Sequence, residues 1–477
     1  MTDVSGYVVR INALVAGGRY AEALKEAEGG LSEHAGDGSL LIGAGNALHG
    51  LGRTDEALAA YRKGADALPE DAVALSNMAG IYYERGSFDD VLKVCDEALG
   101  RDPDYVNAWI HKGNVFSERN EYAKALDAYE QAERGMAGGE SFESPETGDL
   151  IAFNKASALG GAGRYAEADA CYTQLLEKHP DNPEYLSARA ALLEQAEKPD
   201  KAAETYLKLL QVSETSVTHI CLSGCLYNMS VSNDEDKVSA LLDEWLSRFP
   251  DNPVALHAFE TFGHTGADRA SAEYVTELFD AFADSFDEVL EGLEYKAPAL
   301  IAEAVKKSVL PEGGFENALD LGCGTGLCGK YLKECGACNR LTGADLSEKM
   351  LEKAAARKVY DRLECADIEE FLFRCTGDFD LIVSSDVFTY LGDLDRVFRG
   401  IAHALKAGGA VLFTVTENLR TQDPYVLGAS GRFAHGKEYI FEKLDENGLI
   451  LLASDSVELR KEMGEGVPGL LVIARKS

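Results

Sequence analysis

A glycine-rich turn carries the clearest chemical signal in the sequence. It reads Asp320-Leu321-Gly322-Cys323-Gly324-Thr325-Gly326 and lies between an apolar run and a helical pattern. Glycines let a ligand approach the backbone closely, and the N-terminus of the helix that follows attracts electronegative groups. The spacing Gly324-x-Gly326-x-x-Gly329 also fits dinucleotide-binding turns, so the context must decide. A carboxylate at position 320 would repel a pyrophosphate and attract a cationic amino or sulfonium group.

Two more acids follow apolar runs in the same manner. Asp345 ends the run that begins at residue 341, and Asp367 follows the run 363–366. A carboxylate at the end of the second strand is suited to accept hydrogen bonds from both hydroxyls of a ribose. Each acid taken alone could equally be a solvated strand end. The three acids and the glycine turn together predict a nucleotide-type site.

A parallel sheet is needed to bring these residues to one edge. Beyond about Phe262, apolar runs alternate with helical patterns, which favours an α/β fold with parallel strands. The runs are 318–321, 341–345, 363–366, 379–384 and 410–415. After a helical pattern over 438–447, the runs 449–453 and 469–474 are predicted to form an antiparallel edge pair.

Three acids that close successive strands, with glycines after the first, resemble the class I S-adenosylmethionine-dependent methyltransferases over about residues 317–475. The resemblance implies a Rossmann-like domain with a mostly parallel seven-stranded sheet and S-adenosyl-L-methionine as cofactor. In that family the turn cradles the methionine and ribose portion, later positions bind ribose and adenine, and the fourth strand ends near the substrate. The matching positions are Asp320, Gly322, Gly324 and Gly326 for the turn, Asp345 and Leu346 for ribose, Asp367 and Ile368 for adenine, and Ser384 to Asp386 for the fourth strand.

Two other segments strengthen this resemblance. The aromatic and acidic pattern over 274–287 is similar to a helix that covers the cofactor in several small-molecule methyltransferases, although a helix connecting two domains would have the same pattern. The segment Ser430-Gly431-Arg432-Phe433-Ala434-His435 resembles a motif of predicted methyltransferases that carry an N-terminal tetratricopeptide array. That second resemblance covers the architecture of nearly the whole chain.

The first half of the chain is an internal repeat with a period of 34 residues. The aligned copies have their Gly or Asn at Gly18, Gly52, Gly86 and Asn120. A fifth copy at 163–168 is displaced by an insertion at 138–145, which is predicted to be a surface loop. Two weaker copies follow, one around 201–206 and one that ends at 245–250. Degenerate copies at the end of an array are typical of capping units.

The repeat resembles the tetratricopeptide repeat (TPR), and its pattern is best kept between Trp109 and Ala132. The resemblance implies an all-α solenoid whose groove binds a protein or peptide. Ile42 and His111 occupy the groove positions where some family members clamp a carboxylate with Lys and Arg, so no such clamp is expected. The asparagines expected in the groove, which also belong to the repeat pattern itself, are Asn46, Asn77, Asn114 and Asn154.

The composition of the chain limits its expected binding partners and its expected cellular location. The 477 residues include 46 Lys and Arg against 81 Asp and Glu, a formal net charge of −35. This charge repels phosphate backbones, so nucleic acid is not an expected partner. The sequence shows neither a leader pattern nor a membrane-spanning run, and we expect a cytoplasmic chain without a membrane partner. The ten cysteines are expected to be reduced thiols rather than metal ligands, with a half-site at Cys335 and Cys338 as the alternative.

Three regions follow from these patterns. Residues 1–262 are predicted to form the TPR domain, 263–312 a helical linker or lid, and 313–477 the methyltransferase domain. The whole chain is thus expected to be multidomain, with a solenoid followed by an α/β domain.

His435 is the first candidate for a catalytic base, because histidine titrates near neutral pH. A histidine in this position could also be structural or solvated. Asp386 and Tyr390 are further candidates, and Arg432 is suited to pair with a carboxylate on the substrate.

The sequence favours methyl transfer to a small molecule or a protein side chain, with the TPR array docking a protein. Residues 384–388 read Ser-Ser-Asp-Val-Phe, which is not the signature of amino-methylating DNA enzymes. Two alternatives remain open: a TPR scaffold whose methyltransferase-like domain binds cofactor without catalysis, and a nicotinamide-dependent oxidoreductase. Asp320 argues against the oxidoreductase, because a nicotinamide cofactor carries a pyrophosphate.

Overall fold

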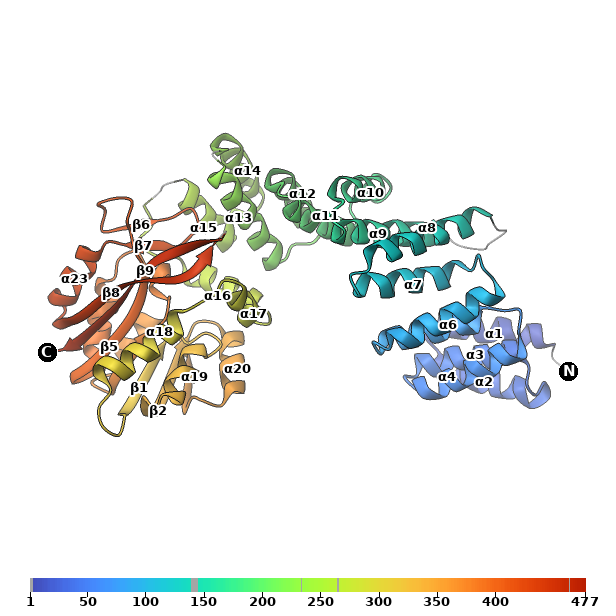
Figure 1. Cartoon of the computed structure of the whole chain (residues 1–477), viewed down its shortest axis with the longest axis horizontal. Coiled ribbons are helices and arrows are strands. Elements are labelled where there is room, and N and C mark those ends of the chain that lie inside the picture. The colour runs from blue at the N-terminus through green and yellow to red at the C-terminus, as the bar shows by residue number, and fades with distance from the viewer. Residues whose placement is uncertain (1–2, 139–144, 233, 264–265, 463) are drawn as a thin grey trace. The chain divides into compact units, whose positions relative to one another are not determined.

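The computed structural model describes residues 3–138, 145–232, 234–263, 266–462 and 464–477. The chain divides into two compact units, Met1–Lys198 and Pro199–Ser477 (Figure 1). The predicted boundaries at residues 262 and 312 both fall within the second unit and stay predictions. Most of the predicted loop at 138–145 lies outside the described residues. No helix in the described part of the chain is both long and apolar enough to span a membrane.

The first unit consists of consecutive helices that pack as pairs. The Gly or Asn that marks each copy of the repeat lies between the two helices of a pair and has a positive φ, between 58° and 75°. This left-handed conformation is accessible to Gly and, more rarely, Asn, which explains the choice of residue. The helices are α1 (Val4–Ala16), α2 (Tyr20–Glu33), α3 (Gly38–Gly50), α4 (Thr54–Ala67), α5 (Val73–Glu84), α6 (Phe88–Arg101), α7 (Val106–Glu118), α8 (Tyr122–Gly138), α9 (Pro145–Gly161), α10 (Tyr165–Lys178) and α11 (Pro183–Gln195).

The asparagines predicted to line the groove bind one another. Asn77 donates to Asn46 Oδ1 at 3.0 Å, and the Tyr61 hydroxyl donates to the same oxygen at 2.7 Å. Asn154 and Tyr129 donate in the same way to Asn114 Oδ1, at 3.0 and 2.8 Å. These bonds tie neighbouring repeats together, so the asparagines serve the array itself.

The second unit begins with helices that the sequence assigns to the end of the array. Trp245 is fully buried there, and its indole N–H donates to His219 Nδ1 at 2.9 Å. Helices of the predicted linker region follow. The bounds are α12 (Pro199–Val212), α13 (Ser216–Val231), α14 (Glu235–Arg248), α15 (Pro253–Phe262), α16 (Ala272–Phe282), α17 (Phe286–Gly292), α18 (Ala297–Ala304) and the π-helical turn η1 (Val305–Val309).

The rest of the second unit is built on a seven-stranded sheet with the order β3-β2-β1-β4-β5-β9-β8. The first five strands in this order are parallel, and β9 and β8 are antiparallel (Figure 1). The strands are β1 (Phe315–Leu321), β2 (Cys338–Asp345), β3 (Arg362–Cys365), β4 (Phe379–Ser384), β5 (Leu405–Thr416), β8 (Leu449–Glu462) and β9 (Glu465–Lys476). This confirms the predicted fold class, although β8 and β9 are at least twice as long as their predicted runs.

Shorter elements connect these strands. The helices are α19 (Leu327–Glu334), α20 (Glu348–Arg357), α21 (Ile368–Arg374), α22 (Asp395–Ala404) and α23 (Lys437–Glu446), with the 3-10 turn η2 (Phe388–Tyr390) after β4. A separate hairpin of β6 (Tyr425–Leu427) and β7 (Phe433–His435) contains much of the 430–435 motif.

Alternate residues of the central strands pack into two different cores. Leu319 and Leu321 of β1 join one cluster of buried residues, and Ala318 joins another. Burial on both faces explains why these strands have continuous apolar runs in the sequence. The chain order reverses between β1 and β4, and in open parallel sheets such a switch point opens a crevice at the carboxyl ends of the strands.

Candidate functional site

The glycine turn lies at this switch point, between β1 and α19. A Cβ atom on Gly322 would lie 2.3 Å from a methyl carbon of Val387, so only glycine fits there. The nearest atom to a Cβ on Gly324 would be 3.9 Å away, in Phe286. The turn is therefore packed on one side and open on the other.

A cavity of about 1140 Å³ adjoins the open side of the turn. The helices α16 and α17 contribute Val275, Phe279, Phe286 and Leu290 to its walls, so the aromatic and acidic segment does cover a cavity. The predicted residues that line it are Gly322, Gly324, Asp345, Leu346, Asp367, Ile368, Ser385, Asp386, Tyr390 and Arg432. Of the residues predicted from the sequence, Asp320, Gly326, Ser384 and His435 are outside this lining.

Asp345 is fixed by the backbone around it. Its Oδ2 accepts the Gly324 N–H at 2.8 Å, and its Oδ1 accepts the Ser347 N–H at 3.0 Å. Burial raises the pKa of this carboxyl, while the hydrogen bonds from Ser347 and Gly324 oppose the rise. Each oxygen keeps a second lone pair, and the carboxylate can accept two further hydrogen bonds from a ligand.

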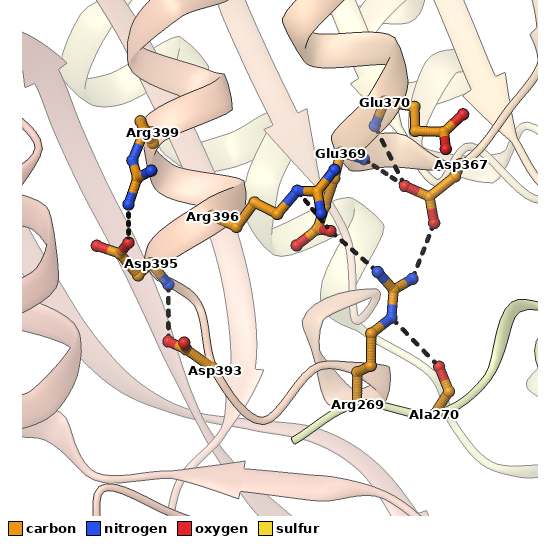
Figure 2. Close-up of polar contacts among 9 residues, drawn as sticks. All are labelled: Arg269, Ala270, Asp367, Glu369, Glu370, Asp393, Asp395, Arg396 and Arg399. Atoms are coloured by element: carbon orange, nitrogen blue, oxygen red, sulfur yellow. Dashed lines mark hydrogen bonds and ion pairs between the residues drawn. The ribbon is translucent and has the colours of Figure 1, made fainter. Parts of the chain in front are cut away.

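Asp367 is the N-cap of α21. Together with Glu369 it is bound by Arg269, an arrangement that we call the Arg269 clamp. Its Oδ1 accepts the N–H groups of Glu369 and Glu370 at 2.9 and 3.2 Å. Arg269 donates to Asp367 Oδ2 at 2.8 Å and to Glu369 at 2.9 Å. Figure 2 shows its guanidinium spanning the two carboxylates, with Arg396 on the other side of Glu369. Burial alone would raise the pKa of Asp367, but Arg269 and the helix N–H groups lower it below its ordinary value.

Asp320 lies behind the turn rather than on the cavity wall. It is fully buried, and its Oδ2 accepts the Tyr360 hydroxyl at 2.6 Å. Its Oδ1 is buried without a hydrogen-bond partner among the described residues. Burial raises the pKa of Asp320 to about 7, against the lowering effect of Tyr360. Ser384 is also buried and donates to Leu321 O at 3.0 Å, which ties β4 to β1.

A chain of alternating charges forms another part of the wall. Asp386 has a φ of 60°, unusual for a residue with a side chain. Its Oδ2 pairs with Arg460 at 2.5 Å, and its Oδ1 is buried without a partner among the described residues. Arg460 and Arg432 both reach Glu462 Oε1, at 2.8 and 2.5 Å. Strained backbone of this kind is frequent at functional sites.

Sequence reasoning missed Arg269, Arg460 and Glu462. Arg269 lies outside every motif, and its partners are 98 and 100 residues away in the chain. Arg460 is 3% exposed. Arg460 and Glu462 are two residues apart on β8, so their side chains lie on the same face of the strand. This spacing of a cation and an acid could have indicated a buried ion pair.

His435 is not brought to the cavity. It is fully buried, and its Nε2 donates to Leu391 O at 2.8 Å. Burial lowers the pKa of His435 from 6.5 to about 4, although the bond to Leu391 opposes the change. A neutral, enclosed imidazole does not fit a catalytic base that exchanges protons with a ligand. We propose instead that His435 holds β7 against the loop at Leu391.

This burial has a consequence for acid stability. Between pH 6.5 and 4 the unfolded chain binds a proton at His435 and the folded chain does not, so stability falls as the pH falls through this window. We expect His435→Gln to remove up to about 3 kcal/mol of this loss. Calorimetric unfolding of both proteins from pH 7.5 to 4 measures the difference. Parallel curves for wild type and variant would contradict the buried neutral state.

Outside α13, the cysteines are free thiols. Burial raises the pKa of Cys328 well above its ordinary value. Cys335 ends α19 and Cys338 begins β2. Within the described ranges, no three His, Cys, Asp or Glu side chains are grouped so that they could hold a metal ion.

Family models match both parts of the chain. Tetratricopeptide repeat models match residues 8–72, 153–215 and 48–109. A methyltransferase domain model matches residues 319–413, which run from β1 to β5. The matched range includes the glycine turn, Asp345, Asp367 and Asp386.

Curated relatives resemble the second part. A malonyl-[acyl-carrier protein] O-methyltransferase of Legionella pneumophila is 27% identical over 174 residues, 35% of this chain and 58% of that protein. A ubiquinone biosynthesis O-methyltransferase of Coxiella burnetii is 30% identical over 134 residues, 27% of this chain and 53% of that protein. The chain thus spans about half the length of the curated relatives it matches.

A solved S-adenosylmethionine-dependent methyltransferase from Mesorhizobium loti is 25% identical, with a TM-score of 0.29 over 38% of this chain and 100% of that chain. The family predicted from the sequence is confirmed by the family models. The chain combines tetratricopeptide repeats with a region that matches a methyltransferase domain model.

Proposed function

We propose that this chain transfers the methyl group of S-adenosyl-L-methionine to a small molecule or a protein side chain. The observation that carries the proposal is the junction of the glycine turn and Asp345. The open backbone at Gly324 donates to the Asp345 carboxylate at the rim of the large cavity, and this carboxylate has lone pairs to spare. Such a cradle suits the ribose and methionine portion of the cofactor.

The other residues of the cavity fit the same ligand. Asp367 and Ile368 are available for adenine, with Asp367 held ionised by Arg269. The unpartnered oxygen of Asp386, which lines the cavity, needs a donor or a positive charge, and the cofactor carries both an ammonium and a sulfonium. Gly322, Gly324 and Gly326 would hold the methionine portion, and Leu346 would contact the ribose.

The cofactor supplies an electrophilic methyl group: the carbon–sulfur bond breaks, its electron pair stays on a neutral thioether, and the acceptor atom forms the new bond. The chain's residues contribute position and environment. Phe279, Phe286 and Tyr390 surround the cavity with aromatic surface that excludes water. Arg460 holds Asp386 so that its free Oδ1 can accept a hydrogen bond or a proton from the acceptor.

The tetratricopeptide array is proposed to dock a protein partner. Helical repeats present extended surfaces of this kind. We propose that the chain acts in the cytoplasm, where exposed and half-buried thiols such as Cys365 and Cys335 would stay reduced.

Calorimetric titration of S-adenosylmethionine and S-adenosylhomocysteine into the full chain tests the proposal, with nicotinamide dinucleotide as the control. We expect micromolar affinity for the first two ligands and none for the third. Incubation with methyl-labelled cofactor and cell extract then tests for transfer. Binding without transfer would favour the scaffold alternative, and absence of binding would overturn the cofactor site.

The Arg269 clamp gives a further prediction with a matched control. Arg269→Ala removes the donor that fixes Asp367 Oδ2 and frees the segment before α16, and we expect about tenfold weaker binding of S-adenosylhomocysteine. Arg396→Ala removes another partner of Glu369, at 3.3 Å, without touching Asp367. That variant is expected to bind as wild type does. Equal losses in the two variants would assign the effect to Glu369 instead.

A further inference from the structure

A second cavity, of about 820 Å³, adjoins the first within the same compact unit. Tyr390 and Arg432 line both cavities. The remaining walls of the second cavity come from α13, α15 and α16 and from the loop before β7. Two of these helices, α13 and α15, belong to the part of the sequence that is predicted as the end of the repeat array.

The loop is fitted closely to α15. His257 of this helix is 4% exposed, and its Nε2 donates to Gly431 O at 2.9 Å. Gly431 has a φ of 73°, and a Cβ atom there would lie 3.1 Å from His257 Nε2. The His257 ring stacks on Tyr274 of α16 with 3.9 Å between ring centres. The 430–435 motif therefore links α15, which belongs to the predicted repeat array, to the site in the second unit. This contact is a structural reason for the motif to occur together with the array.

At the boundary of the two cavities, Arg432 shares its carboxylate partner with a second cation. Within the described part of the chain, Glu462 is the ion-pair partner of Arg432. That partner is shared, because Arg460 binds the same Glu462 oxygen and has Asp386 as well. A guanidinium has five N–H donors, and two of them in parallel match a carboxylate. Arg432 thus has donors left for an anionic group at the boundary of the cavities.

The rest of the second cavity suits a flat apolar molecule. Aromatic rings of Tyr227, Phe262, Tyr274 and Tyr390 contribute to its walls, together with hydroxyl groups of Ser223 and Ser430. Aromatic surfaces pack favourably against a planar ring. We propose that this cavity is the acceptor site and that the acceptor is a small aromatic carboxylic acid held by Arg432, with its reactive atom directed past Tyr390. The proposal rests on the proposed methyl transfer.

Gly224 provides a way to fill this cavity without disturbing the fold. It lies on α13 and lines the cavity, and a Cβ atom there would have no atom within 4 Å. Gly224→Leu should therefore project into the cavity while it improves the helix propensity of α13. Gly29 on α2 is a matched control, because it is also helical with nothing within 4 Å and belongs to the first unit.

The experiment is a calorimetric titration of benzoate, with benzamide as its uncharged counterpart, into the full chain with and without saturating S-adenosylhomocysteine. We expect millimolar affinity for benzoate and at least about tenfold weaker binding of benzamide. Arg432→Gln and Gly224→Leu should each weaken benzoate binding about tenfold, and Gly224→Leu, whose residue lines only the second cavity, should keep its affinity for S-adenosylhomocysteine within about twofold. Gly29→Leu should match wild type in every titration.

Each contrary outcome is distinct. No benzoate binding, equal binding of benzamide, or binding unchanged by Gly224→Leu would overturn the acceptor site, even if S-adenosylhomocysteine binds normally. If the wild-type chain did not bind S-adenosylhomocysteine, the proposed function would be overturned instead. Benzoate binding that persists in that case, and that Gly224→Leu weakens, would still support an aromatic-acid site.

Discussion

Replacement of Asp345 with alanine is expected to lower the affinity for S-adenosylhomocysteine about 1000-fold. The side chain holds the turn through the N–H groups of Gly324 and Ser347 and leaves lone pairs for two ligand hydroxyls. Loss of charge-assisted hydrogen bonds on both sides amounts to about 4 kcal/mol. Calorimetric titration of wild type and variant measures this directly.

Asp361→Ala is the matched control for this prediction. Asp361 also accepts a backbone N–H at the sheet, from Leu341 at 2.7 Å, but it is not part of the cavity lining. We expect some loss of stability and an affinity within about twofold of wild type. If Asp361→Ala weakened binding as strongly as Asp345→Ala, the effect would come from general disorder of the sheet edge.

The second large effect is expected at Asp320, where substitution should stabilise the protein. The folded chain holds the proton of this buried carboxyl up to a pKa of about 7, whereas the unfolded chain releases it near 3.8. Because the folded state binds more protons between these values, wild-type stability falls as the pH rises from about 4 to 7. Asp320→Asn removes this pH-dependent loss of stability. The expected gain in the free energy of unfolding reaches about 4 kcal/mol at pH 7 and stays constant above that pH.

Scanning calorimetry of the ligand-free proteins at pH 4.5, 6 and 7.5 measures the gain. The transition of the second unit is the one that S-adenosylhomocysteine shifts in wild type. We expect the difference between the proteins to grow with pH, and the variant to bind S-adenosylmethionine more weakly because a negative charge is lost. A difference that does not depend on pH would show that Asp320 is ionised throughout. Tyr360→Phe controls for loss of the neighbouring hydrogen bond.

The sequence by itself determined the features that depend on local patterns. The 34-residue period predicts helix pairs because each pair needs the same turn, with Gly or Asn in a left-handed conformation. The apolar runs predict the central strands because both faces of the sheet are buried. The turn at 320–326 and the acids at 345 and 367 could be located because each directly follows its strand.

Contacts between distant segments were decided only by the tertiary structure. Arg269 and Arg460 are positioned by pairings with Asp367 and Asp386, which lie 98 and 74 residues away in the chain, and no local pattern encodes these pairings. The protonation state of His435 also depends on the tertiary structure, because burial lowers the pKa of its imidazole to about 4. The contact between His257 of α15 and Gly431 is likewise encoded by no local pattern. A sequence pattern specifies which face of an element is buried, and only the folded chain specifies what covers that face.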